Sequence, residues 1–213
     1  MDFEEEFEQF DFDQEDSEEA LGDLSDLLGC SRIPIPPIFR TFPDGEPFRQ
    51  CIVCSRDLLD QDVAYHIEKG IRGSEVIFEY AMCRPCSIRM AQDLSRESMQ
   101  RVAAHVHRNA DLLSRSFELL RQSPDRVDPW LARCFLTGMP RQELLTCQIY
   151  GECCGKDLVL GLYPFMVGGP AMTELNGLLS KKTQERLSDF VGDYLGMPPE
   201  FRDLPEDFPV LMI

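Results

Sequence analysis

Long apolar runs are missing from this chain of 213 residues. No window approaches the ~20 apolar residues that a membrane-spanning helix needs, so a transmembrane protein is not expected. Residues 1–6 are acidic and lack both the basic start and the apolar core of a secretory signal. These two absences lead us to expect a cytoplasmic protein with no membrane partner.

The signatures of common enzyme classes are also missing. The sequence has no glycine-rich phosphate loop, no Ser/His/Asp arrangement and no dinucleotide-binding fingerprint. Histidine is scarce, and His66, His105 and His107 are the only three. Isolated histidines are most often ordinary core or surface residues. No small-molecule substrate is evident, and we expect no enzymatic activity.

Basic residues are few, with 21 Lys and Arg against 38 Asp and Glu, and the net charge is −17. The imbalance is concentrated in residues 1–27, which hold 13 acids and no base. Phenylalanines are interspersed among these acids, at positions 3, 7, 10 and 12. Such a segment either stays a solubilising tail or docks onto a basic groove of a partner protein. We predict a disordered acidic tail over residues 1–32 and a proline-rich linker over residues 33–47.

Cysteine is abundant, with nine residues, and four of these form two CxxC doublets. Cys51 and Cys54 form the first doublet, and Cys83 and Cys86 form the second. Four thiolates suit one tetrahedral zinc ion at about 2.3 Å and leave no position open for water or substrate. The spacing, the odd total and the missing export signal favour metal binding over disulfides. We therefore predict one structural Zn²⁺ held by these four residues; the spacing is also compatible with iron.

A hairpin and a helix are expected around the second doublet. Residues 63–69 and 75–81 each alternate between apolar and polar side chains, which predicts two strands with Gly70 and Gly73 between them. After Cys86 the apolar residues recur with a helical period.

The order of these elements is a CxxC loop, a hairpin, and a CxxC at the start of a helix. Over residues 48–105 this order and spacing resemble the treble-clef class of zinc fingers. The resemblance implies a small α+β fold organised around the metal, and it implies no particular activity.

The second half of the sequence contains a weak copy of the first. Residues 94–102 align with residues 179–187, and Cys51 then has its counterpart in Cys134. The positions that match the other three ligands are held by Thr137, Gly168 and Ala171. We predict an α+β fold of two tandem treble-clef-like halves, the first zinc-bound and the second metal-free. A rival register that aligns Cys54 with Cys154 shortens the repeat and is disfavoured.

Three further segments complete the expected domain organisation: a four-cysteine, zinc-binding treble-clef-like domain at residues 48–108, a helical connector at residues 109–130, and the degenerate second copy at residues 131–213. Four more cysteines fall in the last segment: Cys134, Cys147, Cys153 and Cys154. Buried core thiols are the favoured interpretation for them. A second metal site or a redox pair is the alternative.

The predicted helices carry a series of arginines at Arg89, Arg96, Arg101, Arg108 and Arg115. Such a series is most often a solvated helix face with ion pairs, but it can also contact nucleic-acid phosphates. The sequence as a whole favours a zinc-stabilised protein-interaction or regulatory module with a protein partner. The alternative is a nucleic-acid-associated regulator in which the acidic tail gates the arginine-bearing helix.

Overall fold

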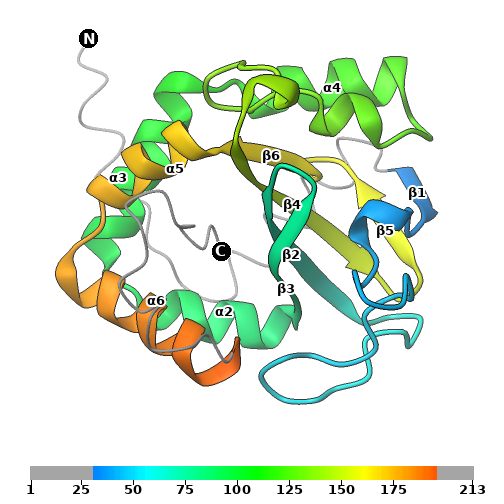
Figure 1. The fold of residues 1–213 in the computed structure, drawn as a ribbon, viewed down its shortest axis with the longest axis horizontal. Coiled ribbons are helices and arrows are strands. Elements are labelled where there is room, and N and C mark those ends of the chain that lie inside the picture. The colour runs from blue at the N-terminus through cyan, green and yellow to red at the C-terminus, as the bar shows by residue number, and fades with distance from the viewer. Residues whose placement is uncertain (1–30, 196–213) are drawn as a thin grey trace, which may run out of the picture.

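The computed structural model describes residues 31–195. The predicted acidic tail therefore lies almost entirely outside the described residues. Those residues combine five α-helices with a six-stranded antiparallel sheet (Figure 1), which confirms the expected mixture of helix and strand. The strands are β1 (Ser31–Pro34), β2 (Ala64–Arg72), β3 (Glu75–Cys83), β4 (Thr146–Cys154), β5 (Asp157–Leu160) and β6 (Phe165–Gly168). The α-helices are α2 (Arg84–Asp93), α3 (Arg96–Asn109), α4 (Leu112–Gln122), α5 (Gly169–Gly177) and α6 (Lys181–Tyr194). Short 3-10 helices are η2 (Pro37–Phe39), η3 (Asp128–Leu131) and η4 (Arg141–Glu143).

A single sheet contains strands from both halves of the sequence. Its order is β1-β5-β4-β2-β3, and β6 pairs with β4 on the side where β5 also pairs. The central pair is β2 with β4, whose register runs from Ala64 opposite Cys154 to Arg72 opposite Thr146. Because every residue of both strands takes part, this pair joins the two halves into one continuous hydrogen-bonded layer.

The predicted hairpin is present as β2 and β3, and its strands are longer than expected. Gly73 has a φ of +59° at the turn, a conformation that glycine adopts without strain. Gly70 lies inside β2, opposite Phe78. A Cβ added to Gly70 would stand only 2.2 Å from the Phe78 ring. The close approach of the Phe78 ring, rather than the turn, therefore explains why position 70 is a glycine.

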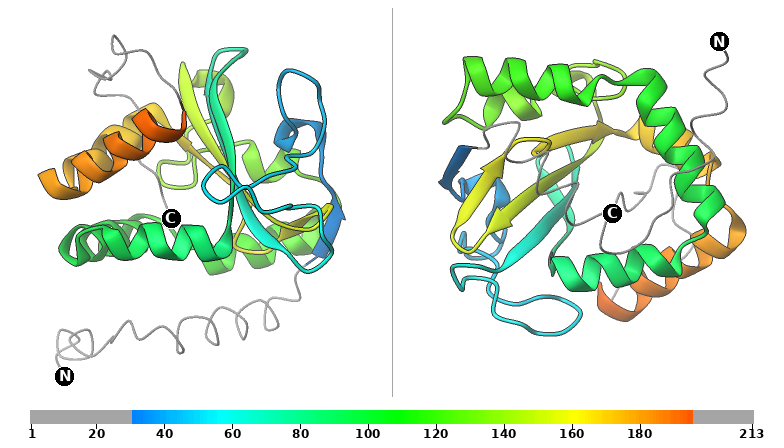
Figure 2. Two further views of the ribbon diagram at one scale, coloured as in Figure 1. Left: turned by 90° about the horizontal axis from the view of Figure 1, so that it is seen from below. Right: turned by 180° about the vertical axis from the view of Figure 1, so that it is seen from behind.

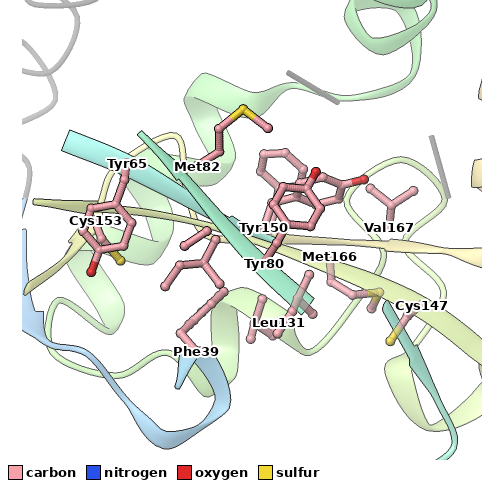
Figure 3. Packing of buried hydrophobic residues seen from close by; sticks show 14 of the residues in the cluster. Phe39, Tyr65, Tyr80, Met82, Leu131, Cys147, Tyr150, Cys153, Met166 and Val167 are labelled. Atoms are coloured by element: carbon pink, nitrogen blue, oxygen red, sulfur yellow. The ribbon is translucent and has the colours of Figure 1, made fainter. Parts of the chain in front are cut away.

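The two faces of the sheet carry different side chains (Figure 3). We call the first the core face: it carries Tyr65, Ile67 and Ile149, which are 0 % exposed, and packs against Phe39 and Leu131. Alternate residues of the same strands form the opposite side, here called the helical face, because side chains of a strand alternate between faces. Its central residues are His66, Glu68, Tyr80, Met82 and Tyr150. Helices α2, α3, α5 and α6 lie on this side of the strands (Figure 2).

The proline-rich segment is part of the fold. Its residues 33 and 34 complete β1, whose first two residues belong to the predicted tail, and β1 pairs with β5 at an edge of the sheet. Ile35 is buried directly after this strand, and Phe39 is fully buried in η2. The amide of Ile35 also donates to the carbonyl oxygen of Lys156 at 3.3 Å. Apolar residues between the prolines thus anchor the segment to the core face.

Helices α3 and α6 start at serine caps that contact each other. Ser95 accepts a hydrogen bond from the amide of Ser98, and Ser180 accepts one from the amide of Thr183. The amide of Ser95 donates to Thr183 Oγ1 at 3.0 Å, and the amide of Ser180 donates to Ser98 Oγ at 2.8 Å. Each helix start therefore satisfies an otherwise unpaired amide of the other. The exchange is symmetric between the two halves of the chain.

Candidate metal centre

The two cysteine doublets meet where β3 ends. The sulfur atoms of Cys51, Cys54, Cys83 and Cys86 all lie within 4.8 Å of one another. The Sγ atoms of Cys54 and Cys83 are 3.6 Å apart. Zinc–sulfur bonds of about 2.3 Å would separate the sulfurs of a tetrahedral site by about 3.8 Å. The four predicted ligands are therefore close enough together to hold one metal ion.

The first doublet sits in a tight loop closed by backbone hydrogen bonds. The amide of Cys51 donates to the carbonyl oxygen of Arg56 at 2.9 Å, and the amide of Ser55 donates to that of Cys51 at 2.9 Å. Ser55 has a φ of +56°, which turns the chain back directly after Cys54. This conformation is rare for a non-glycine residue, and the loop that requires it is the one that presents the thiols.

The second doublet spans the junction between β3 and α2. Cys83 is the last residue of β3 and the N-cap of α2. Its amide donates to the Sγ atom of Cys51 at 3.4 Å. The amide of Ile52 donates to the carbonyl oxygen of Ala81 at 2.9 Å, which fastens the loop to β3. Amides at a helix start favour negative charge, so the backbone amide of Cys86 offsets part of the burial that favours the thiol form of Cys83.

Arg89 brings a positive charge to the site. Its guanidinium donates to the Sγ atom of Cys86 at 3.0 Å. Burial raises the pKa of Cys86, and Arg89 opposes that effect. Burial raises the pKa of Cys83 to about 12. At Cys51, burial also favours the thiol, but backbone amides, led by that of Cys83, outweigh it and lower the pKa to about 7. Four thiolates at this spacing would repel one another, and a divalent cation bound by all four would remove that repulsion.

The arrangement is closed around its centre. Cys51, Cys83 and Cys86 are buried, and Cys54 is exposed. Four sulfur ligands fill a tetrahedral coordination sphere, which leaves no position for a water molecule or a substrate. An ion held here would cross-link a loop, a strand end and a helix start.

A second loop around Cys134 repeats the hydrogen bonds of the first. The amide of Cys134 donates to the carbonyl oxygen of Met139 at 2.9 Å, and the amide of Gly138 donates to that of Cys134 at 2.8 Å. Gly138 has a φ of +69°, in the same position of the loop as Ser55. The amide of Gly168 donates to the Sγ atom of Cys134 at 3.3 Å, like the amide–sulfur bond of the first loop.

The second loop has only one of the four sulfurs. Thr137, Gly168 and Ala171 stand in the positions that correspond to the other three ligands. Among residues 31–195, no second group of three or more cysteine, histidine or acidic side chains converges in a way that could hold an ion.

The other three cysteines do not form a redox pair within the described structure. Cys147 and Cys153 are buried and belong to the hydrophobic core, as favoured from the sequence. Cys154 is partly exposed, and its thiol donates to the carbonyl oxygen of Gln61 at 3.4 Å. Cys153 and Cys154 are neighbours on β4, so their side chains point to opposite faces of the sheet.

The five arginines of the predicted series lie in different surroundings. Three of them are exposed on α3: Arg96, Arg101 and Arg108. Arg89 lies against Cys86 in the metal centre, a contact that its i+3 spacing along the helix could have indicated. The guanidinium of Arg115 donates to the carbonyl oxygen of Trp130 at 2.6 Å and lies 5.5 Å from its ring. Arg115 is thus engaged in packing against η3, and nucleic-acid contact by the series stays a prediction.

The three histidines are separated. His66 lies on β2, and its ring centroid is 5.4 Å from that of Tyr163. Burial lowers the pKa of His66 to about 4, so the imidazole is neutral at physiological pH. His105 lies 3.6 Å from a carboxylate oxygen of Glu174, and His107 is exposed on α3. None of the three lies among the four thiols.

No family model, curated protein or solved structure matches this chain. The interpretation of the metal centre therefore depends on its own geometry. Over residues 31–195, each helix is either too short or too polar to cross a bilayer.

Proposed function

We propose that this protein is a zinc-stabilised protein-interaction or regulatory module that acts in the cytoplasm. The observation that carries the proposal is the closed set of four sulfurs at Cys51, Cys54, Cys83 and Cys86. Sulfur ligands in a mononuclear tetrahedral site favour zinc over the harder divalent metals. Because the protein itself would fill all four positions, the ion serves the fold, and the function is binding rather than catalysis.

The fold that we propose is a pair of treble-clef-like halves. The shared hydrogen bonds of the Cys51 and Cys134 loops support it, as do the matching starts of the helices that follow. Pro85 and Pro170 occupy the first turn of α2 and α5, where proline is favoured. The reciprocal caps of α3 and α6 add a third correspondence. The proposed units are residues 48–108 with the ion, residues 109–130 as connector and residues 131–213 without an ion.

The metal assignment is tested by elemental analysis of the purified protein. We expect one zinc per chain, and a marked loss of zinc in Cys54→Ser. The matched control is Cys154→Ser, which removes a partly exposed thiol outside the site and should leave the zinc content unchanged. Purified protein without metal, or with iron as the main ion, would contradict the assignment.

The partner that we propose has a basic groove, because residues 1–27 hold 13 acids, no base and several phenylalanines. Affinity capture followed by mass spectrometry should compare the full chain with a chain that lacks residues 1–27. A partner retained by the full chain, released by salt and lost with the tail supports the proposal. Equal capture by both chains would show that the tail is not the docking element.

A second candidate function is regulation of a nucleic acid. The observation in its favour is the exposure of Arg96, Arg101 and Arg108 along α3. If the acidic tail competes for this helix, removal of residues 1–27 should raise the affinity for DNA or RNA at low salt. In the shortened chain, Arg108→Ala should then reduce the salt dependence of binding by about one ion. Unchanged affinity after tail removal would exclude this gating.

A further inference from the structure

A small pocket lies on the helical face of the sheet, and none of the four cysteines lines it. Its walls include His66, Glu68, Tyr80, Tyr150 and Tyr163 from the strands and their connection, and Ser87 from α2. Glu68 is at the centre of this group, because β3 places Tyr80 directly opposite it and β4 places Tyr150 opposite it on the other side. Figure 3 labels both tyrosines, which come from the strands on either side of β2.

The carboxyl group of Glu68 is buried and only half satisfied. The residue is 5 % exposed. The Tyr80 hydroxyl donates to its Oε2 atom at 2.5 Å. Its Oε1 atom is buried and has no hydrogen-bond partner among the described residues. Buried carboxyl oxygens almost always have a partner, so the open side of Glu68 indicates a group that residues 31–195 do not supply.

Among residues 31–195, no ion pair involves Glu68. The guanidinium of Arg84 acts electrostatically on His66 and on Glu152, which lie opposite each other on β2 and β4. Burial with no cation beside it raises the pKa of Glu68 well above its ordinary value, so a cation that entered this aromatic pocket would displace the carboxyl proton.

The size of the pocket limits what that cation can be. The cavity volume is about 20 Å³, which is room for one group of the size of a water molecule. An ammonium group has that size, whereas a quaternary ammonium is larger. The lining side chains supply one carboxyl group, and their other oxygens are hydroxyls, whereas a calcium-like ion takes six to eight oxygens from carboxylates, carbonyls and water. An ammonium needs only acceptors for its three donors, and aromatic faces stabilise its charge.

We propose that this pocket binds the ammonium group of a primary amine, with Glu68 as its counter-ion and the aromatic side chains as its walls. The amine is either a free small molecule or a lysine side chain of a partner, because both present the same group. The site shares no residue with the metal centre, although Ser87 directly follows Cys86 on α2. It adds amine recognition to a protein in which the metal has a structural role.

The test uses the full metal-bound chain and methylammonium chloride as the probe. Binding is followed by NMR through the resonances of Met82 and the tyrosine rings, with tetramethylammonium and potassium chloride at equal ionic strength as comparisons. We expect saturable shifts with methylammonium alone. Glu68→Gln keeps the shape of the side chain but removes the charge, and it should weaken methylammonium binding at least about tenfold. The control is Glu75→Gln, an exposed position in the same hairpin, which should leave binding unchanged.

Several outcomes would overturn the proposal. They are the absence of saturable shifts, equal shifts with tetramethylammonium or potassium, or equal affinity in Glu68→Gln and the unchanged protein. A high-resolution structure grown in methylammonium that shows only a water molecule beside Oε1 would also overturn it. Should Glu68→Gln fail to fold, the comparison of the three cations on the unchanged protein still decides. Once an amine site is established, a lysine-containing peptide and free alkylamines distinguish the two sources.

Discussion

Replacement of Cys54 by serine tests the structural role of the metal centre most directly. The four thiols fasten the Cys51 loop to the end of β3 and the start of α2. Structural zinc sites of this kind contribute about 10–16 kcal/mol of apparent binding free energy. Domains of this size are stable by only about 5–15 kcal/mol. The loss of one ligand should therefore cost on the order of 5 kcal/mol or more, enough to unfold or aggregate the first half.

The assay is thermal and urea unfolding followed by circular dichroism, with and without a metal chelator. The unchanged protein should lose stability when the chelator is added, because the ion binds the folded state. Cys54→Ser should start from a much lower stability and should show little further loss with chelator. Thr137→Ser is the matched control, since Thr137 holds the equivalent position in the second loop and should melt like the unchanged protein. An unchanged melting curve in Cys54→Ser would refute a structural metal at this site.

Three further predictions concern the sheet and the helix caps. Burial raises the pKa of Glu68 above its ordinary value of 4.5, so the unfolded chain loses this proton first as the pH rises. The contribution of Glu68 to the free energy of unfolding is therefore fully present below about pH 4.5 and declines above it. Between pH 5 and pH 8, the free energy of unfolding measured with urea should fall less in Glu68→Gln than in the unchanged protein. Gly70→Ala should destabilise the fold by about 1–3 kcal/mol, because its Cβ would meet the Phe78 ring, and Phe78→Leu in the same chain should recover part of that loss in thermal melts. Thr183→Val should cost about 1–2 kcal/mol by urea unfolding, because it removes the cap acceptor for the Ser95 amide, and a change within experimental error would show that the reciprocal caps do not couple the helices.

The metal centre was predictable because its four ligands occur in the sequence as two pairs with a recognisable short spacing. Two CxxC doublets and an alternating segment between them predict which four sulfurs converge, and the structure brings the same four together. The strands of the hairpin follow from alternation over residues 63–69 and 75–81. Their extension through Gly70 does not, since it depends on a ring that covers the glycine from the neighbouring strand.

The environment of single charged residues was much less predictable. The spacing of Arg89 and Arg115 along their helices indicates a common surface stripe. In the structure, Arg89 contacts the sulfur of Cys86, and Arg115 lies against Trp130. Both contacts depend on what packs against the helix. Periodicity shows which residues lie on the same face of a helix, but it does not show which other segment packs against that face.

The central acid of the amine pocket shows the same limit. In sequence, Glu68 looks like one more polar residue of an alternating strand. Its neighbours on β3 and β4 are tyrosines, and the β4 tyrosine lies more than 80 residues away along the chain. Only the pairing of β2 with β4 makes Glu68 a buried, half-satisfied carboxyl group.

By itself, the sequence determined the local elements: the cysteine doublets, the hairpin, the helical segment after Cys86 and the concentration of charge in residues 1–27. These depend on residue spacing, backbone preference and net charge, which neighbours along the chain decide. The tertiary structure decided that β2 and β4 join both halves in one sheet, that β1 forms an edge of it, and that Glu68 is buried. Those outcomes depend on contacts between distant residues, because burial and pairing are properties of the assembled layers rather than of any single segment.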